Sequence, residues 1–184
     1  MPTRYFTQAV FEFLEELALN NNKPWWEENK ERYINKIREP ALDFVTDFGQ
    51  RLEEISPHFV ADPRVNGGSL MRPYRDMRFA KGEPYKTNVG IQFRHEQGKD
   101  VHAPGFYLHI EPGQSFAGVG LWNPETKVAR AIRQSINDDP ATWGKAGIQI
   151  RSGRHGRSAA MPKLVSRGSR RSWILTIHTP MTCG

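Results

Sequence analysis

The sequence predicts an α+β protein in which N-terminal helices pack on one face of an antiparallel sheet and a further helix follows the last strand. Through residues 5–55, apolar side chains recur at intervals of three and four, the spacing of amphipathic helices. After Pro57, apolar residues alternate with polar ones in short runs bounded by Gly and Pro, which is typical of strands with one buried face. A chain of 184 residues is long enough for one domain with its own core.

The first helix is expected over residues 5–19. Its apolar stripe comprises Phe6, Val10, Phe13, Leu14 and Leu17. The asparagines at 20–22 end it, because Asn tolerates the left-handed cap conformation. Pro24 suits the first turn of a second helix, which runs toward Pro40. Pro40 either kinks this helix or separates it from a third one over residues 41–55.

Two adjacent tryptophans stand near the start of the second helix. We expect one of Trp25 and Trp26 to cover the core between the first two helices, and the other to be half exposed at the helix start. The alternative is that the two rings form a ligand-stacking pair.

Four strands are predicted after the helices. Their ranges are 69–74, 88–95, 105–111 and 115–122. In the second of them, Val89, Ile91 and Phe93 alternate with small or polar residues. The sequence EPGQ between the last two strands has the length of a hairpin turn. A helix is then expected from residue 124 to 138, followed by a shorter helical piece over 141–146.

The composition indicates a soluble, cytoplasmic protein. Hydrophobic residues make up 38% of the chain and charged residues 25%, as in globular domains. No apolar run reaches the ~18–20 residues of a membrane span, and the N-terminus lacks the features of a secretory signal. The single cysteine, Cys183, excludes an internal disulfide and a thiolate metal cluster, and the histidines lack ligand spacing. No metal and no cofactor are therefore expected.

The net charge of +6 is unevenly distributed. Residues 148–184 contain six Arg, one Lys and no acidic residue, whereas residues 1–147 hold 19 basic and 20 acidic side chains. We therefore expect one near-neutral domain over 1–147 and an atypical basic tail over 148–184, whose composition allows disorder. One interpretation of the tail is a nucleic-acid-binding arm, and the other is an end translated in a shifted reading frame.

The genetic code makes the shifted frame testable. Trp173 is encoded by TGG and the codon of Ile174 begins with AT, so the frame that starts on the last base of the Trp codon reads Asp. The same frame reads Asp again across Met181 and Thr182. With permitted codon choices between these points, WILTIHTPMT becomes DPDHPHPYD.

Four long segments carry a family resemblance. They are FEFLEELALNNNKPWWEENKERY, RPYRDMRFAKGEPYKTNVGIQF, PGFYLHIEPGQSFAGVGLW and PETKVARAIRQSI, and together they extend over residues 5–146. In order and spacing they resemble a family of conserved microbial proteins known as the domain of unknown function 2461 family. The resemblance implies a single α+β domain and no established activity, so no catalytic residue carries over. Family members continue into an Asp-His-Pro element, which the shifted frame recovers, so the shifted frame is favoured over a native basic arm.

The stretch Met71 to Asn88 concentrates charge in a way that folding does not require. Within eighteen residues it combines five cations and two tyrosines with a glycine and two prolines that set loop geometry. Guanidinium groups bind phosphate or carboxylate in a bidentate way and Lys adds a mobile charge, so we predict an anion site. The predicted ligand-binding residues are Arg72, Tyr74, Arg75, Arg78, Lys81, Tyr85 and Lys86. The alternative is that these cations pair with the acid-rich helices as solvated surface.

Arg75 stands out within this stretch. In a regular strand it shares a mostly apolar face with Met71 and Pro73, so it is expected to be partly buried and to need a carboxylate or a bound anion as its partner. Pro73 has no N–H group to donate, which places such a strand at a sheet edge or a bulge.

A second group of polar residues lies on the predicted strands. His109 and Glu111 alternate on one face, where they either serve as base and acid or face solvent. The secondary site candidates are Asp76, Arg94, His109 and Glu111.

Three functional hypotheses follow, and the sequence leaves open whether the protein is an enzyme. The first is a domain that binds a small anionic ligand, such as a phosphorylated metabolite or nucleotide, with catalysis as an open addition. The alternatives are a non-enzymatic nucleic-acid-binding protein that uses the tail and the cation cluster together, and a protein-interaction domain suggested by the paired tryptophans and the edge strand. The near-neutral body favours a compact anion over a long polyanion, and no membrane partner is expected.

Overall fold

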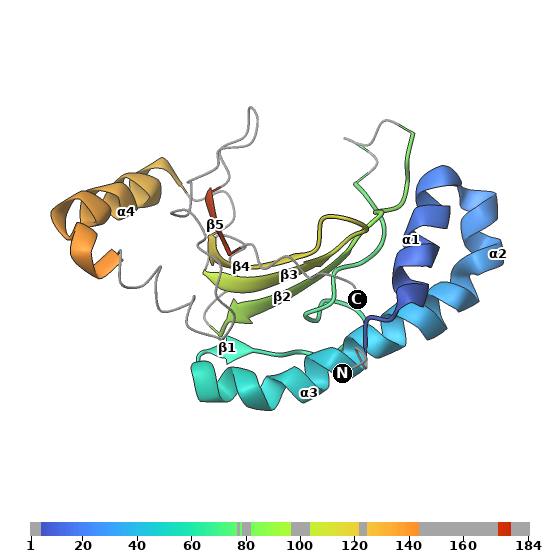
Figure 1. The fold of residues 1–184 in the computed structure, drawn as a ribbon, viewed down its shortest axis with the longest axis horizontal. Helices are drawn as coiled ribbons and strands as arrows, with labels where there is room; N and C mark the ends of the chain where they lie inside the picture. The colour runs from blue at the N-terminus through green and yellow to red at the C-terminus, as the bar shows by residue number, and fades with distance from the viewer. Residues whose placement is uncertain are drawn as a thin grey trace.

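The computed structural model describes residues 5–76, 78, 82–96, 104–121 and 125–143, and the backbone of residues 173–177. The helices are α1 (Gln8–Leu19), α2 (Lys23–Tyr33), α3 (Glu39–Ile55) and α4 (Thr126–Asp138). The strands are β1 (Phe59–Val60), β2 (Val89–His95), β3 (Gly105–Ile110), β4 (Phe116–Leu121) and β5 (Trp173–Ile177). They form one antiparallel sheet in the order β1-β2-β3-β4-β5 (Figure 1). The predicted α+β class, with helices first and another helix after the β2–β4 strands, is confirmed.

The first three helices follow the predicted apolar stripes, and Pro40 does not end the helical run. After α2 the chain continues through a π-helical turn, η1 (Ile34–Arg38), which leads directly into α3. The N–H of Glu39 bonds to the carbonyl of Ile34, five residues earlier. Pro40 follows within the first two positions of α3. The wider turn accommodates the proline, whose missing N–H would interrupt a regular α-helix at this point.

The turn between β3 and β4 explains why these strands form a tight hairpin. The N–H of Gln114 donates to the carbonyl of Glu111 at 3.1 Å, and Gly113 has a φ of 72°. Pro112 precedes that glycine, and this order of Pro and Gly is characteristic of a type II turn. The hairpin predicted from EPGQ is confirmed.

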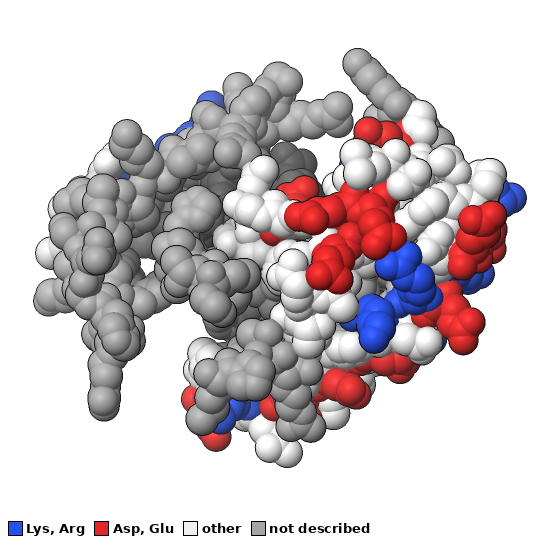
Figure 2. Space-filling model, turned by 45° about the vertical axis from the view of Figure 1, so that its right-hand side comes forward, with Lys and Arg blue, Asp and Glu red and all other residues white. Residues whose placement is uncertain are grey.

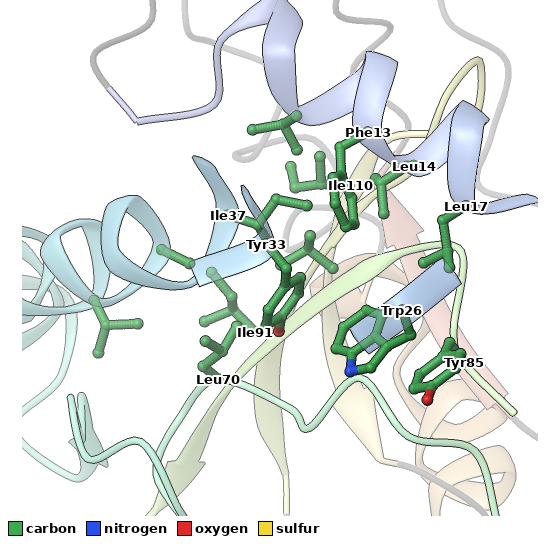
Figure 3. Close-up of a cluster of buried hydrophobic side chains, with 14 of the residues drawn as sticks. Phe13, Leu14, Leu17, Trp26, Tyr33, Ile37, Leu70, Tyr85, Ile91 and Ile110 are labelled. Atoms are coloured by element: carbon green, nitrogen blue, oxygen red, sulfur yellow. The ribbon is translucent and has the colours of Figure 1, made fainter. Parts of the chain in front are cut away.

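One face of the sheet packs on the helices. Figure 3 shows Ile91 of β2 and Ile110 of β3 among side chains from α1, α2 and η1, and they are only 0% and 2% exposed. Burying each such side chain contributes about 1.5–3 kcal/mol. Because side chains alternate along a strand, Gly90 and His109, which lie opposite each other on β2 and β3, belong to the other face.

The predicted strand over 69–74 is wrong as a regular strand. Leu70 bridges Ile91 of β2 and Tyr74 bridges Tyr85, but these are isolated bridges. Between them Pro73 cannot donate to a ladder, so regular pairing is interrupted there. The chain therefore leaves the sheet edge after Leu70 and rises beside α1 as a separate arm (Figure 1).

The last strand of the sheet comes from the C-terminal part of the chain. Within the basic tail, the backbone of β5 pairs with β4, with Trp173 opposite Leu121. None of the described helices combines the length and hydrophobicity that a bilayer-crossing helix needs.

Candidate functional site

The basic stretch folds into a short hairpin. Tyr74 pairs with Tyr85, and on either side of this pair the N–H groups of Arg75 and Lys86 donate to proline carbonyls at 2.8 and 2.7 Å. The two prolines thus act only as acceptors, the one role that their backbone allows in a ladder. We call the described residues between 71 and 88 the basic hairpin.

Asn21, in the link between α1 and α2, holds the basic hairpin against the helices. Its Nδ2 donates to the carbonyl of Tyr85 at 3.0 Å, and its Oδ1 accepts from the N–H of Tyr85 at 3.0 Å. The Tyr85 ring stacks on Trp26 with a centroid separation of 4.2 Å and an interplanar angle of 13° (Figure 3). Burial raises the pKa of Tyr85. The two hydrogen bonds of the Asn21 side chain and the stacked Tyr85 ring together fix where the cations of the hairpin lie.

The tryptophans have the structural roles that were expected. Trp26 is 1% exposed in the core between the helices, and Trp25 is half-buried with its ring 5.5 Å from that of Phe13. Because Trp26 is enclosed, its ring is available neither for stacking on a ligand nor for an exposed protein interface. Its Nε1 has no hydrogen-bond partner within the described structure.

Two arginines of the basic hairpin have carboxylate partners inside it. Arg78, whose side chain is 81% exposed, contacts Asp76 at 2.6 Å, and this hydrogen bond lowers the pKa of Asp76. Arg75 is less exposed and contacts Glu83 at 3.0 Å. The expectation that Arg75 is partly buried and paired is confirmed, and Glu83 is the carboxylate that serves it.

Arg72 and Lys86 differ from these two. Among the described residues, neither forms an ion pair with a carboxylate. Lys86 is half-buried, and its pKa is lowered by burial and then by the charges of Arg72 and Arg75. The charges of Arg72 and Arg75 thus act on Lys86, and of these three cations only Arg75 has a carboxylate partner in the described structure.

The acidic residues of the helices are partly engaged with cations of their own. Arg32 on α2 contacts Glu16 on α1 at 2.8 Å, and Lys30 lies 3.9 Å from Glu27 within α2. Figure 2 shows acidic and basic side chains intermixed on the side of the molecule that carries these helices. Arg75 and Arg78 pair with Glu83 and Asp76 of the hairpin itself, so these two ion pairs do not involve the acid-rich helices.

Of three remaining predicted residues, Tyr74 and Arg94 are described and Lys81 is not. Tyr74 belongs to the hairpin, is 45% exposed and meets Trp26 edge-on at 6.0 Å. Arg94 lies toward the other end of β2, exposed, with its Nε 3.3 Å from Oε1 of Gln92. Lys81 lies outside the described residues.

A second polar cluster occupies the face of the sheet opposite the helices. Nε2 of His109 lies 2.9 Å from Oε2 of Glu111, and Nδ1 lies 3.0 Å from the hydroxyl of Tyr107. Nδ2 of Asn88 is also 3.4 Å from Nδ1 of His109, and the imidazole stacks on Phe116 at 4.9 Å. The His109 side chain is 16% exposed, so these neighbours cover most of it.

The partners of His109 determine where its proton lies. An ionised Glu111 can only accept, so Nε2 carries the hydrogen and Nδ1 is left as an acceptor. The hydroxyl of Tyr107 donates to that acceptor. Burial and then the charge of Glu111 raise the pKa of Tyr107, which keeps the phenol protonated and able to donate. Ser115 steadies Glu111, because its Oγ bonds to both the N–H and the carbonyl of that residue at 3.2 and 3.0 Å.

Gly90 makes room for this cluster and joins it to the hairpin. A Cβ at this position would lie 3.0 Å from both Sδ of Met71 and the hydroxyl of Tyr107. The N–H of Met71, at the start of the basic hairpin, donates to the Gly90 carbonyl at 2.9 Å. The hairpin therefore leaves the sheet directly beside the polar cluster.

Sequence reasoning identified His109 and Glu111 but missed Tyr107 and Asn88. The signal for Tyr107 was present, because the run YLHIE places three polar side chains on one face of a strand. The contact of Asn88 depends on the register of β2 against β3, which periodicity does not specify.

The fold and the site together define an α+β protein with a basic hairpin beside a polar sheet face. No group of three or more His, Cys, Asp or Glu side chains in the described part is arranged to hold a metal ion. The chain belongs to the family described as "Conserved hypothetical protein (DUF2461)", whose model matches residues 9–168, and the resemblance stated from the sequence is thereby confirmed. No curated protein and no solved structure matches the chain.

Proposed function

We propose that the basic hairpin binds a small anionic ligand that carries phosphate or carboxylate, where Arg72, Arg75 and Lys86 converge. The observation that carries the proposal is the half-buried ammonium group of Lys86, which lies beside two guanidinium groups and has no carboxylate partner in the described structure. A partly buried charge is normally compensated, because its desolvation is costly. A bound anion supplies that compensation, and Arg72 adds a planar pair of donors for its oxygens.

The charge of the hairpin suits a compact ligand. Residues 71–88 contain five cations and two carboxylates, a net charge of +3, within residues 1–147, whose net charge with the hairpin included is −1. A ligand with two or three negative charges balances the charge of the hairpin. Tight non-specific binding of nucleic acid commonly uses ~6–10 phosphate contacts, more than this hairpin offers.

Thermal unfolding in the presence of inorganic phosphate, pyrophosphate and citrate tests the proposal. Chloride at the same ionic strength separates specific binding from general screening. At a ligand concentration of about 100 times Kd, binding to the folded state adds about 2.7 kcal/mol of stability. We expect at least one of the three anions to raise the Tm of the native protein above the chloride reference.

Matched lysine variants locate the effect. Lys86→Gln should abolish the anion-dependent rise in Tm, whereas Lys127→Gln, which removes the same charge from an exposed position on α4, should retain it. The proposal is wrong if no anion stabilises the native protein more than chloride does, or if both variants lose the effect equally.

A further inference from the structure

We infer that Tyr107, His109 and Glu111 form a proton relay in which Tyr107 acts as a general base on a bound small anion bearing an acidic O–H or C–H group. The inference makes the protein an acid–base enzyme. It rests on the proposed function for the class of substrate, but its chemical test does not require any anion to be bound.

The direction of the two hydrogen bonds that join Tyr107, His109 and Glu111 supports a relay. Glu111 accepts from Nε2 of His109, and Nδ1 accepts from the hydroxyl of Tyr107, so each group is placed to hand a proton toward the carboxylate. The lone pairs of the Tyr107 oxygen that do not take part in this chain remain free to accept a proton. A carboxylate that orients an imidazole, which in turn accepts from a hydroxyl, is the arrangement by which proteins activate weak oxygen bases and nucleophiles.

The side chains of the relay are more buried and more closely packed than those on a solvent-facing strand. The imidazole is 16% exposed and lies against the ring of Phe116 on β4. On β2 the register partner of Tyr107 is Gln92, and Gly90 leaves space for the Tyr107 hydroxyl. On β4 its register partner is Gly118, which is buried. Glu111 is the charged group that faces His109 within the described structure.

The anion site and the relay share one border. Asn88, at the end of the basic hairpin, contacts Nδ1 of His109, and Met71, at its start, lies over Gly90, beside which the Tyr107 hydroxyl also lies. A ligand held by the cations of the hairpin is therefore next to the face that carries the relay.

The proton transfer balances without a further reactant. The Tyr107 oxygen takes a proton from the O–H or C–H group of the ligand, while its own proton passes to Nδ1 of His109. The electron pair of the broken bond stays on the ligand, which gains one negative charge beside the cations of the hairpin. His109 becomes an imidazolium, and its charge is compensated by Glu111.

Benzenesulfonyl fluoride tests the relay without a known substrate. The Tyr107 oxygen attacks the sulfur, an S–O bond forms, and the S–F bond breaks with departure of fluoride, while the phenol proton passes to His109. Peptide mass spectrometry gives the labelling rate of each tyrosine. Tyr74 is the internal reference, because it is 45% exposed and has no imidazole partner among the described residues.

We expect Tyr107 to be labelled faster than Tyr74 despite its lower exposure. General-base assistance typically contributes ~10²–10⁴-fold, so His109→Gln should slow the labelling of Tyr107 by at least about tenfold. Glu111→Gln should slow it by a smaller factor, because the imidazole stays oriented but its cation is less stabilised. In the native protein the rate should fall at acidic pH, because a protonated imidazole cannot accept the phenol proton.

A matched control comes from a second histidine–glutamate pair. His58 contacts Glu96 at 2.7 Å on the surface, so His58→Gln removes the same kind of pair and should leave the labelling of Tyr107 unchanged. Circular dichroism checks that each variant is folded. If His109→Gln is unfolded, the Glu111 variant and the pH profile still test the relay.

The relay is refuted if Tyr107 is labelled no faster than Tyr74, or if its rate is independent of His109, Glu111 and pH. Anion-dependent stabilisation that persists in that case would leave the proposed function intact. Fast, His109-dependent labelling without any anion-dependent stabilisation would overturn the proposed function alone.

Discussion

Replacing Asn21 with Ala tests whether one side chain holds the basic hairpin to the helices. The Asn21 amide makes two hydrogen bonds, one to the N–H and one to the carbonyl of Tyr85, both at 3.0 Å and both partly buried. Alanine removes both partners at once and leaves two backbone groups of Tyr85 to find water beside the Trp26 ring. We expect the variant to lose stability and to loosen the hairpin.

The magnitude follows from the number and surroundings of the bonds. A hydrogen bond contributes about 0.5–1.5 kcal/mol net, so the pair contributes about 1–3 kcal/mol. The value should lie in the upper half of that range, because Tyr85 is 4% exposed and its freed backbone groups have limited access to water. The stacked Tyr85 and Trp26 rings add packing that the substitution does not remove directly.

Urea unfolding monitored by tryptophan fluorescence measures the loss. The matched control is Asn20→Ala, which removes the same side chain one position earlier, where its Nδ2 makes one exposed hydrogen bond to the Glu16 carbonyl at 2.9 Å. We expect this control to cost no more than about 0.5 kcal/mol. If Asn21→Ala is no more destabilising than Asn20→Ala, the amide does not hold the hairpin and the reasoning fails.

Three further predictions concern the shifted pKa values of Lys86 and Tyr33 and the close packing at Gly90. Lys86→Met should raise the free energy of unfolding at pH 7 without added anion, because the lowered pKa of Lys86 means that folding disfavours the charged amine. In urea titrations at a series of pH values, this gain in stability should vanish above ~pH 10.5, where the amine is neutral in the unfolded chain as well. Tyr33 has its pKa raised by burial to about 12, so its contribution to stability is complete below pH ~10 and is lost as the pH rises to about 12; Tyr33→Phe should remove that loss. Gly90→Ala should cost about 1–3 kcal/mol in urea unfolding and slow the labelling of Tyr107, because the new methyl group meets Met71 and the phenol at 3.0 Å, and a neutral or stabilised variant would contradict this packing.

Hydrophobic periodicity predicted most of the fold, because apolar side chains recur every three to four residues in the helices and every two residues in the strands. The stripes of α1 and α3 and the alternation of β2 and β3 each fix which face is buried, and those faces form the core. The strand over 69–74 was wrong because the same alternation continues through Pro73, where the backbone cannot pair.

The site was predicted only in part, for a related reason. Local composition indicated the cations of the hairpin, and local spacing indicated the partial burial of Arg75. Which cations lack a carboxylate depends on tertiary contacts, such as the position of Glu83 opposite Arg75. The contact between Asn88 and His109 likewise depends on strand register, which no short window of sequence contains.

In the proposed mechanism, charge links the anion site of the basic hairpin to the relay on the sheet. Transfer of a proton to His109 forms an imidazolium next to Glu111, so the relay ends with no net charge, while the ligand becomes more negative by one charge. That added charge is what Arg72 and Lys86 can stabilise, and they can do so more strongly for the reacted ligand than for the unreacted one. Lys86 gains most, because its ammonium group is held half-buried beside two other cations and without a carboxylate in the described structure. In the proposed mechanism, the placement of Lys86 that disfavours its charged form in the free protein therefore favours the transition state of proton abstraction.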